Sequence, residues 1–203
     1  DLTMSANRAV TATFGLLRTL DVTLAGAGSG SVASVPGGIA CPGDCTEAYI
    51  DGTAVTLTAT PGAGSYFVGW SGSCSGSGGC DLTMSANRAV TATFGLLRTL
   101  DVTVAGGGGG SVASVPPGIA CPGDCTEAYV DGTPVTLTAT PDPGASFLGW
   151  SGSCSGSGDC DLTMSANRAV TATFVVFTIF IDGFGSNDPC EWSLNVGGTA
   201  CPP

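Results

Sequence analysis

Two twelve-residue stretches contain the side chains most suggestive of chemistry: GWSGSCSGSGGC at 69–80 and its near copy at 149–160. A Cys or Ser in a Gly/Ser-rich loop can act as a nucleophile, but it needs a neighbouring base, most often His and sometimes Lys. The chain has no His, and all five of its basic residues are Arg. We therefore predict no catalytic residues and no enzyme activity, and a structural role for Cys74.

Carboxylates are the remaining candidates for acid–base work, with 16 Asp and Glu in the chain. A pair of carboxylates flanking a cleft could hydrolyse a glycoside. Here, however, the acids fall in turn sequences such as Pro42-Gly43-Asp44 and Asp51-Gly52. Asp favours turns because its side chain bonds the local backbone. We predict solvated turn residues, and no cofactor.

The formal net charge of -11 bears on the partners of the chain. Nucleic-acid binders and proteins that dock on anionic lipid present basic patches, so neither partner is expected. No apolar run approaches the roughly 20 residues of a membrane-spanning helix. The longest, FVVFTIFI at 174–181, has the length of a strand.

Ten cysteines recur with regular spacing, which is typical of disulfides in an oxidising compartment. Zinc bound by four cysteines is the alternative, but its knuckles usually have gaps of two to four residues, whereas the second gap here is five. We predict no metal, and local disulfides rather than long-range pairs such as Cys41 with Cys74. The predicted pairs are Cys41–Cys45, Cys74–Cys80, Cys121–Cys125, Cys154–Cys160 and Cys190–Cys201.

The chain is a tandem repeat with a period of 80 residues. DLTMSANRAVTATF occurs three times, at 1–14, 81–94 and 161–174. This periodicity defines repeat 1 (15–94) and repeat 2 (95–174), preceded by the C-terminal hairpin of a partial repeat (1–14). Residues 175–203 read as the degenerate start of a further repeat.

The partial copies have two interpretations. The chain is either a window of a longer array, or its missing halves come from neighbouring chains. In the second case, residues 1–14 would be a hairpin donated to another subunit by β-strand addition. An exposed apolar strand at 175–181 would also be a template for another chain.

The pattern inside a repeat is that of β-structure. Apolar and polar residues alternate over 20–24, 54–60 and 88–94, with weaker strands at 31–35 and 47–51 and an aromatic one at 65–70. Turn sequences separate them. We expect an all-β fold of tandem, small, disulfide-stapled β-sandwich or barrel-like domains of about 80 residues.

Trp70 and Trp150 directly precede the cysteine loops. Each is expected to pack over the disulfide or into the core. The alternative is a ligand-stacking face, as in sugar-binding modules.

Several signatures match a known family: GxVxSxPxGI-C at 30–41, GTxVTLTAxP at 52–61, F-x-GWSG-C-SG-x-G-x-C at 67–80 and the closing TM-x-A-x-R-x-VTATF at 83–94. They recur 80 residues later. The chain therefore resembles the divergent InlB B-repeat domain of bacterial surface and secreted proteins. The resemblance fades in 175–203 and brings no catalytic residues. It implies an extracellular or cell-surface location.

Two functions remain from the sequence. The first is a non-catalytic structural protein, a stalk or filament subunit that self-associates head-to-tail by β-strand exchange. The second is an adhesin-type module that binds glycan or a host surface protein through Trp70 and Trp150, Tyr49 and Tyr129, and the Gly/Ser loops. Near-identical tandem units, which touch mainly their neighbours, favour the first.

Overall fold

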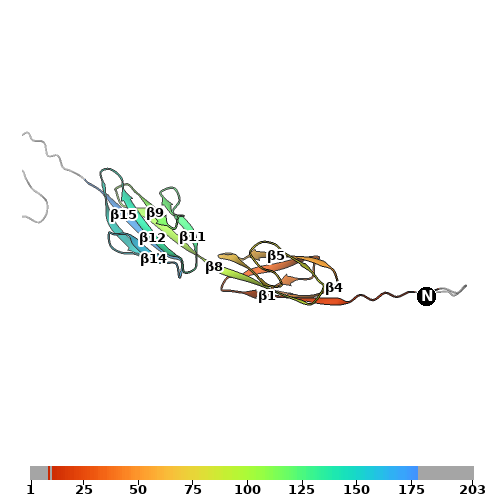
Figure 1. The fold of residues 1–203 in the computed structure, drawn as a ribbon. Helices are drawn as coiled ribbons and strands as arrows, with labels where there is room; N and C mark the ends of the chain where they lie inside the picture. The colour runs from red at the N-terminus through yellow and green to blue at the C-terminus, as the bar shows by residue number, and fades with distance from the viewer. Residues whose placement is uncertain (1–8, 10, 178–203) are drawn as a thin grey trace, which may run out of the picture.

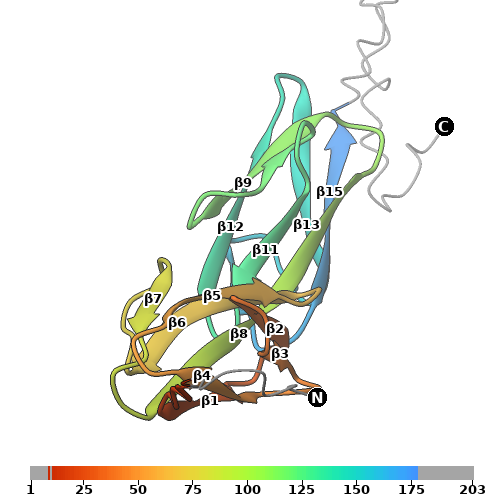
Figure 2. The ribbon, with the colours of Figure 1, turned by 90° about the vertical axis from the view of Figure 1, so that its right-hand side faces the viewer.

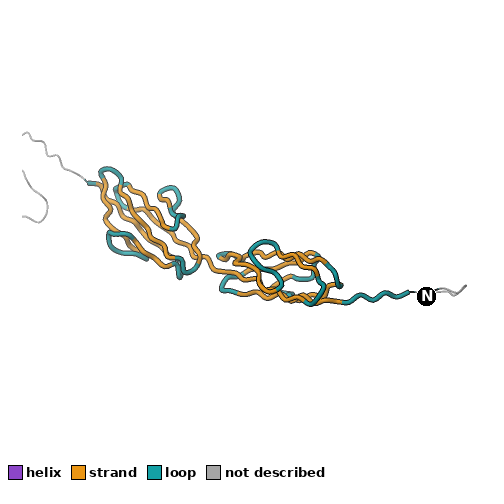
Figure 3. The backbone as a smooth tube through the Cα atoms, in the orientation of Figure 1, coloured by secondary structure: helices purple, strands orange, loops and turns teal. Residues whose placement is uncertain are grey.

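The computed structural model describes residues 9 and 11–177, and its regular structure within that range is entirely β-strand (Figure 3). The predicted all-β fold is confirmed. Repeat 1 contains β1 (Leu17–Ala25), β2 (Gly30–Val35), β3 (Ala40–Cys41), β4 (Thr46–Ile50), β5 (Ala54–Pro61), β6 (Ser65–Gly72) and β7 (Cys80–Thr83). After β8 (Arg88–Ala105), repeat 2 contains β9 (Gly110–Val115), β10 (Ala120–Cys121), β11 (Thr126–Val130), β12 (Pro134–Pro141), β13 (Ala145–Gly152), β14 (Cys160–Thr163) and β15 (Arg168–Val176).

Each repeat packs two sheets against each other. In repeat 1 a small sheet has the order β3-β2-β5-β7, and the facing strands are β4, β1, β8 and β6. Repeat 2 repeats this arrangement with β10-β9-β12-β14 facing β11, β8, β15 and β13. Each repeat is therefore a small sandwich.

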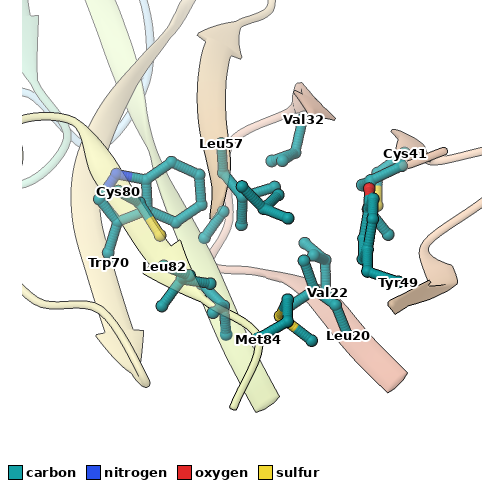
Figure 4. Close-up of a cluster of buried hydrophobic side chains, with 14 of the residues drawn as sticks. Leu20, Val22, Val32, Cys41, Tyr49, Leu57, Trp70, Cys80, Leu82 and Met84 are labelled. Atoms are coloured by element: carbon teal, nitrogen blue, oxygen red, sulfur yellow. The ribbon is translucent and has the colours of Figure 1, made fainter. Parts of the chain in front are cut away.

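The core of repeat 1 follows from alternation along its strands. Val90, Ala92 and Phe94 of β8 point inward and are at most 2% exposed. Leu20 of β1 and Leu57 of β5 face them from the same sheet and the opposite one, at 0% and 1% exposure. Figure 4 shows Leu20 and Leu57 in this core, together with Val32, Leu82 and Met84. Repeat 2 has an equivalent core.

A buried hydroxyl pair connects the two sheets. Ser34 in β2 and Tyr49 in β4 lie 2.8 Å apart, oxygen to oxygen, and the backbone N–H of Ile39 donates to the Ser34 hydroxyl at 3.0 Å. Burying a hydroxyl costs free energy unless it is hydrogen-bonded. The pair is therefore satisfied where the sheets meet, and it recurs as Ser114 and Tyr129.

The two repeats share one strand, because β8 runs for 18 residues from the end of repeat 1 into repeat 2. The predicted boundary between 94 and 95 falls inside it. Leu97 N–H donates to the Gly64 carbonyl beside β6, and Leu96 carbonyl accepts from Asp131 N–H beside β11. The backbone N–H of Leu97 and the carbonyl of Leu96 therefore point to opposite edges of β8. Strands of repeat 1 pair with the first part of β8, and strands of repeat 2 pair with its second part. The repeats consequently lie end to end (Figures 1 and 2).

Gly95 lies at this junction without breaking the strand. It is paired with Tyr66 in β6, and a Cβ at Gly95 would lie 2.4 Å from the Tyr66 ring. In repeat 2 the corresponding pair is Ser146 and Val175. The larger side chain of the pair is thus on β6 in repeat 1 and on β15 in repeat 2. In both repeats it faces a small residue, so the pair fits.

The strands predicted over 20–24, 54–60, 65–70 and 88–94 are present, with bounds extended by up to several residues. The sequence did not indicate the two-residue β3, nor that 88–94 and 100–104 form one strand. The predicted partner strand 175–181 and the cysteines Cys190 and Cys201 lie mostly or wholly outside the described residues.

A one-residue insertion between Leu96 and Leu97 tests the shared strand. Inward residues of β8 occupy even positions in both repeats, among them Val90 and Leu100. One extra residue would turn Leu100 and Val102 outward, because a strand alternates with period 2. We expect repeat 2 to lose about 1.5–3 kcal/mol for each side chain expelled.

A two-residue insertion at the same point is the matched control, since it preserves the alternation. Calorimetry should give it a higher melting temperature for repeat 2 than the one-residue insertion. Equal melting temperatures would show that the strand is not continuous in the way described.

Candidate functional site: the disulfide loops and the junction between repeats

The loop between β6 and β7 is closed by the Cys74–Cys80 disulfide, with the two Cα atoms 5.7 Å apart. Trp70 holds this loop with two hydrogen bonds. Its backbone N–H donates to the Gly76 carbonyl at 2.7 Å, and its indole Nε1–H donates to the Gly78 carbonyl at 2.9 Å. The loop is therefore held over the indole by three contacts: the hydrogen bond from the Trp70 main chain, the hydrogen bond from the Trp70 side chain, and the disulfide.

Trp70 itself packs in the core, which is the first of the two roles considered from the sequence, the other being a ligand-stacking face. It is 5% exposed, and its ring meets Phe67 edge-on at 5.0 Å between centroids. Trp150 is likewise 5% exposed and contacts Phe147 in the same way. Stacking on a sugar requires an open aromatic face, and neither indole presents one in this structure.

A second disulfide, Cys41–Cys45, closes the turn that carries the chain from β3 in the small sheet to β4 in the facing sheet. Its Cα atoms are 4.9 Å apart, and Cys41 is 3% exposed. The carbonyl of Cys45 accepts from Val22 N–H at 2.8 Å. The disulfide thus anchors the crossover between sheets to β1.

Repeat 2 carries the same two disulfides, Cys121–Cys125 and Cys154–Cys160. One substitution changes its second loop, because Asp159 stands where repeat 1 has Gly79. The Asp159 carboxylate accepts from the Thr138 hydroxyl at 3.1 Å and so fastens the loop to β12. Repeat 1 lacks this bond.

A hollow of about 270 Å³ lies under that loop in repeat 1. Its lining includes Thr56, Leu57, Phe67 and Trp70, with the glycines of the loop. No titratable side chain lines it. Without an acid, base or nucleophile, the hollow has no means of general acid–base or covalent catalysis.

The carboxylates that the structure describes are engaged mainly with hydroxyls and arginines at the surface. Asp21 accepts from the Thr46 hydroxyl at 2.9 Å, and Asp81 accepts from the Thr56 hydroxyl at 2.6 Å. Within residues 9 and 11–177, no group of three or more His, Cys, Asp and Glu is placed to hold a metal ion. In the same part of the chain, no helix long and apolar enough to cross a membrane is found.

Polar side chains tie the part of β8 that opens repeat 2 to the rest of that repeat. The Asn167 side-chain oxygen accepts from Thr99 N–H at 3.1 Å, and Arg98 forms an ion pair with Asp131. The same contacts recur at the start of repeat 1. There the Asn87 side chain accepts from Thr19 N–H, and Arg18 Nε lies 2.6 Å from Asp51.

Apolar side chains just before and at the start of repeat 1 are more exposed than their counterparts 80 residues later. Phe14 is 92% exposed, whereas Phe94, its equivalent at the end of repeat 1, is 1% exposed. Leu16 and Leu17 are 65% and 63% exposed. Residues 11–16 carry the sequence of a final strand but form no ladder in the described structure.

Comparison with known proteins assigns the repeats. The profile of the divergent InlB B-repeat domain matches residues 20–96 and 100–176. None of the curated proteins compared with the chain matches it.

Two solved structures show distant similarity, each at 10% sequence identity. The shaft pilin SpaA from Lactobacillus rhamnosus GG is matched over 82% of this chain and 99% of its own, with a TM-score of 0.27. The major pilin from Streptococcus pyogenes is matched over 79% and 97%, with a TM-score of 0.22. Scores this low carry no argument about the fold or role of this chain.

Truncating the indole tests its structural role. We expect Trp70→Ala to destabilise repeat 1 by about 3–5 kcal/mol, because it empties a core position under the disulfide loop. Urea unfolding followed by circular dichroism measures the change. Val68→Ala is the control on the same strand: Val68 is 47% exposed, so a change within about 0.5 kcal/mol is expected. A similar cost for both would contradict the core role.

Proposed function

Because the chain belongs to the divergent InlB B-repeat domain family, whose members occur in bacterial surface proteins, we propose that it is a non-catalytic structural array. In this proposal the repeats hold other parts of a cell-surface or secreted protein at a distance, as a stalk or as a filament subunit. The single observation that supports it best is the 18-residue β8, which joins the repeats without a flexible linker.

The register of β8 gives the length that each repeat adds. Leu20 is paired with Arg88, and Leu100, the equivalent of Leu20 in repeat 2, lies twelve residues beyond Arg88 on the same strand. Twelve residues at about 3.3 Å each correspond to a rise of about 40 Å per repeat. An array of such repeats is an extended object rather than a compact one.

The disulfides support an extracellular location for the array. Four of them are formed in the described residues, two per repeat. Disulfides persist in oxidising compartments, and small domains with thin cores depend on them.

We further propose that arrays self-associate by strand addition. The exposed Phe14 and Leu16 lie on a segment whose copy in β8 completes the sheet of repeat 1. Residues 1–14 would then supply the final strand of another repeat, in a neighbouring chain or elsewhere in the same array. The alternative function, glycan or host-protein binding through Trp70 and Trp150, is less supported because both indoles are buried.

The rise per repeat can be measured by small-angle X-ray scattering. A concatemer with two added repeats should have a maximum dimension about 80 Å larger than the two-repeat chain, because each repeat adds about 40 Å. A dimension that grows much less would contradict the extended array.

Self-association can be measured by sedimentation velocity over a range of concentrations. We expect the full chain to associate, and both a deletion of residues 1–14 and Phe14→Asp to reduce association, because each removes the apolar face of the added strand. Phe14→Leu is the matched control and should retain association. A full chain that stays monomeric would exclude strand addition between chains. The proposal of an extended array would still stand, because it does not depend on association.

A further inference from the structure

Tension along the array would act on one pair of strands in each repeat. A pull from the two ends enters repeat 1 through the N-terminal end of β1 and leaves through the C-terminal direction of β8. These two strands are neighbours and parallel, with six registered pairs from Leu20↔Arg88 to Ala25↔Thr93. The pull therefore drives β1 and β8 past each other along their length.

This geometry loads the ladder in shear. When parallel neighbours are pulled toward opposite ends, every hydrogen bond between them bears force together, and the strands separate only after all have yielded. When the same strands are pulled apart from one end, the bonds yield one at a time. The shear direction therefore needs a much larger force for the same ladder. Repeat 2 has the same arrangement, with β15 parallel to β8 from Arg168↔Leu100 to Thr173↔Ala105.

Side chains brace the ladder against sliding. Leu20 is 0% exposed and Val22 is 6% exposed, so movement of β1 along β8 drags both through the core. On its other edge, β1 is held by β4, and Val22 N–H donates to the Cys45 carbonyl. The Asn87 side chain bonds Thr19 N–H just before the ladder begins.

The disulfides lie outside the load path. Cys41–Cys45 and Cys74–Cys80 each close a short local loop between β1 and β8, with sequence separations of 4 and 6. They do not link the strands that would slide. They do shorten the chain that a repeat can release on unfolding, by about 25 Å at about 3.6 Å per residue.

We infer that each repeat is a mechanical clamp, in which the parallel pairing of its first and last strands resists tension applied along the array. This inference rests on the proposed function as an extended array and adds that the array bears force. It applies to each repeat separately, because each has its own parallel ladder.

Single-molecule force spectroscopy of the full chain tests the clamp by changing only the pulling points. Handles at the two chain ends load repeat 2 in shear. A handle on a residue introduced at Gly107, with the other at the C-terminal end, pulls at the adjacent ends of β8 and β15 and peels them apart. A Cβ at Gly107 meets nothing within 4 Å, so a clickable side chain fits there.

The unfolding force of repeat 2 should be several-fold higher in the end-to-end geometry than in the Gly107 geometry. The matched control is the Gly107-substituted chain pulled from its ends, which should unfold at the force of the unsubstituted chain. Reduction of the disulfides should lengthen each end-to-end unfolding step by about 25 Å.

Equal forces in the two geometries would overturn the clamp. That result would leave the extended array untouched, since the array depends on the rise measured by scattering. Conversely, a compact scattering profile would contradict the array whatever the forces are.

Discussion

The parallel pairing of the first and last strands of each repeat determines the form of the whole molecule. Because β1 and the start of β8 run in the same direction, the chain enters a repeat at one pole and leaves it at the other. An antiparallel pair would return the chain to the pole where it entered. The next repeat can therefore begin on the same strand, and β8 serves as the last strand of one sandwich and the first of the next.

Each sandwich is small, and its stability depends on details at its loops. A repeat of this size buries a limited core, so close approaches and disulfides contribute a large share of its stability. Gly30, for example, lies against the ring of Phe94, where a Cβ would come within 2.3 Å. The Trp70 indole under the Cys74–Cys80 loop is a second such contact.

Much of the fold could be predicted from the sequence because alternation over 54–60 and 88–94 has the period of a strand buried on one face. The period of 80 residues and the resemblance to the B-repeat family were also readable, and both are confirmed. The continuity of β8 was not. The repeat boundary was predicted between 94 and 95, whereas the strand continues through Gly95, which is required for the close approach of Tyr66. That requirement depends on a side chain 29 positions earlier, which no local pattern reveals.

The candidate site was only partly accessible to the same reasoning. The absence of His and Lys argued against catalysis without any structure. Whether Trp70 faced the core or solvent could not be decided locally, because aromatic residues before a glycine-rich loop serve both roles. Its burial depends on the loop folding back to accept the indole N–H, which is a tertiary contact.

The identity of the three DLTMSANRAVTATF segments has a consequence for fidelity of folding. The ladder that β1 forms with residues 88–93 could form equally with 168–173, since the sequences are the same. Closing the longer loop costs only about 0.6 kcal/mol for a doubling of length. Strand pairing alone therefore does not exclude a misfolded form in which β1 pairs with 168–173 and a whole repeat is skipped. That form is excluded because the intervening strands would be left without a partner sheet.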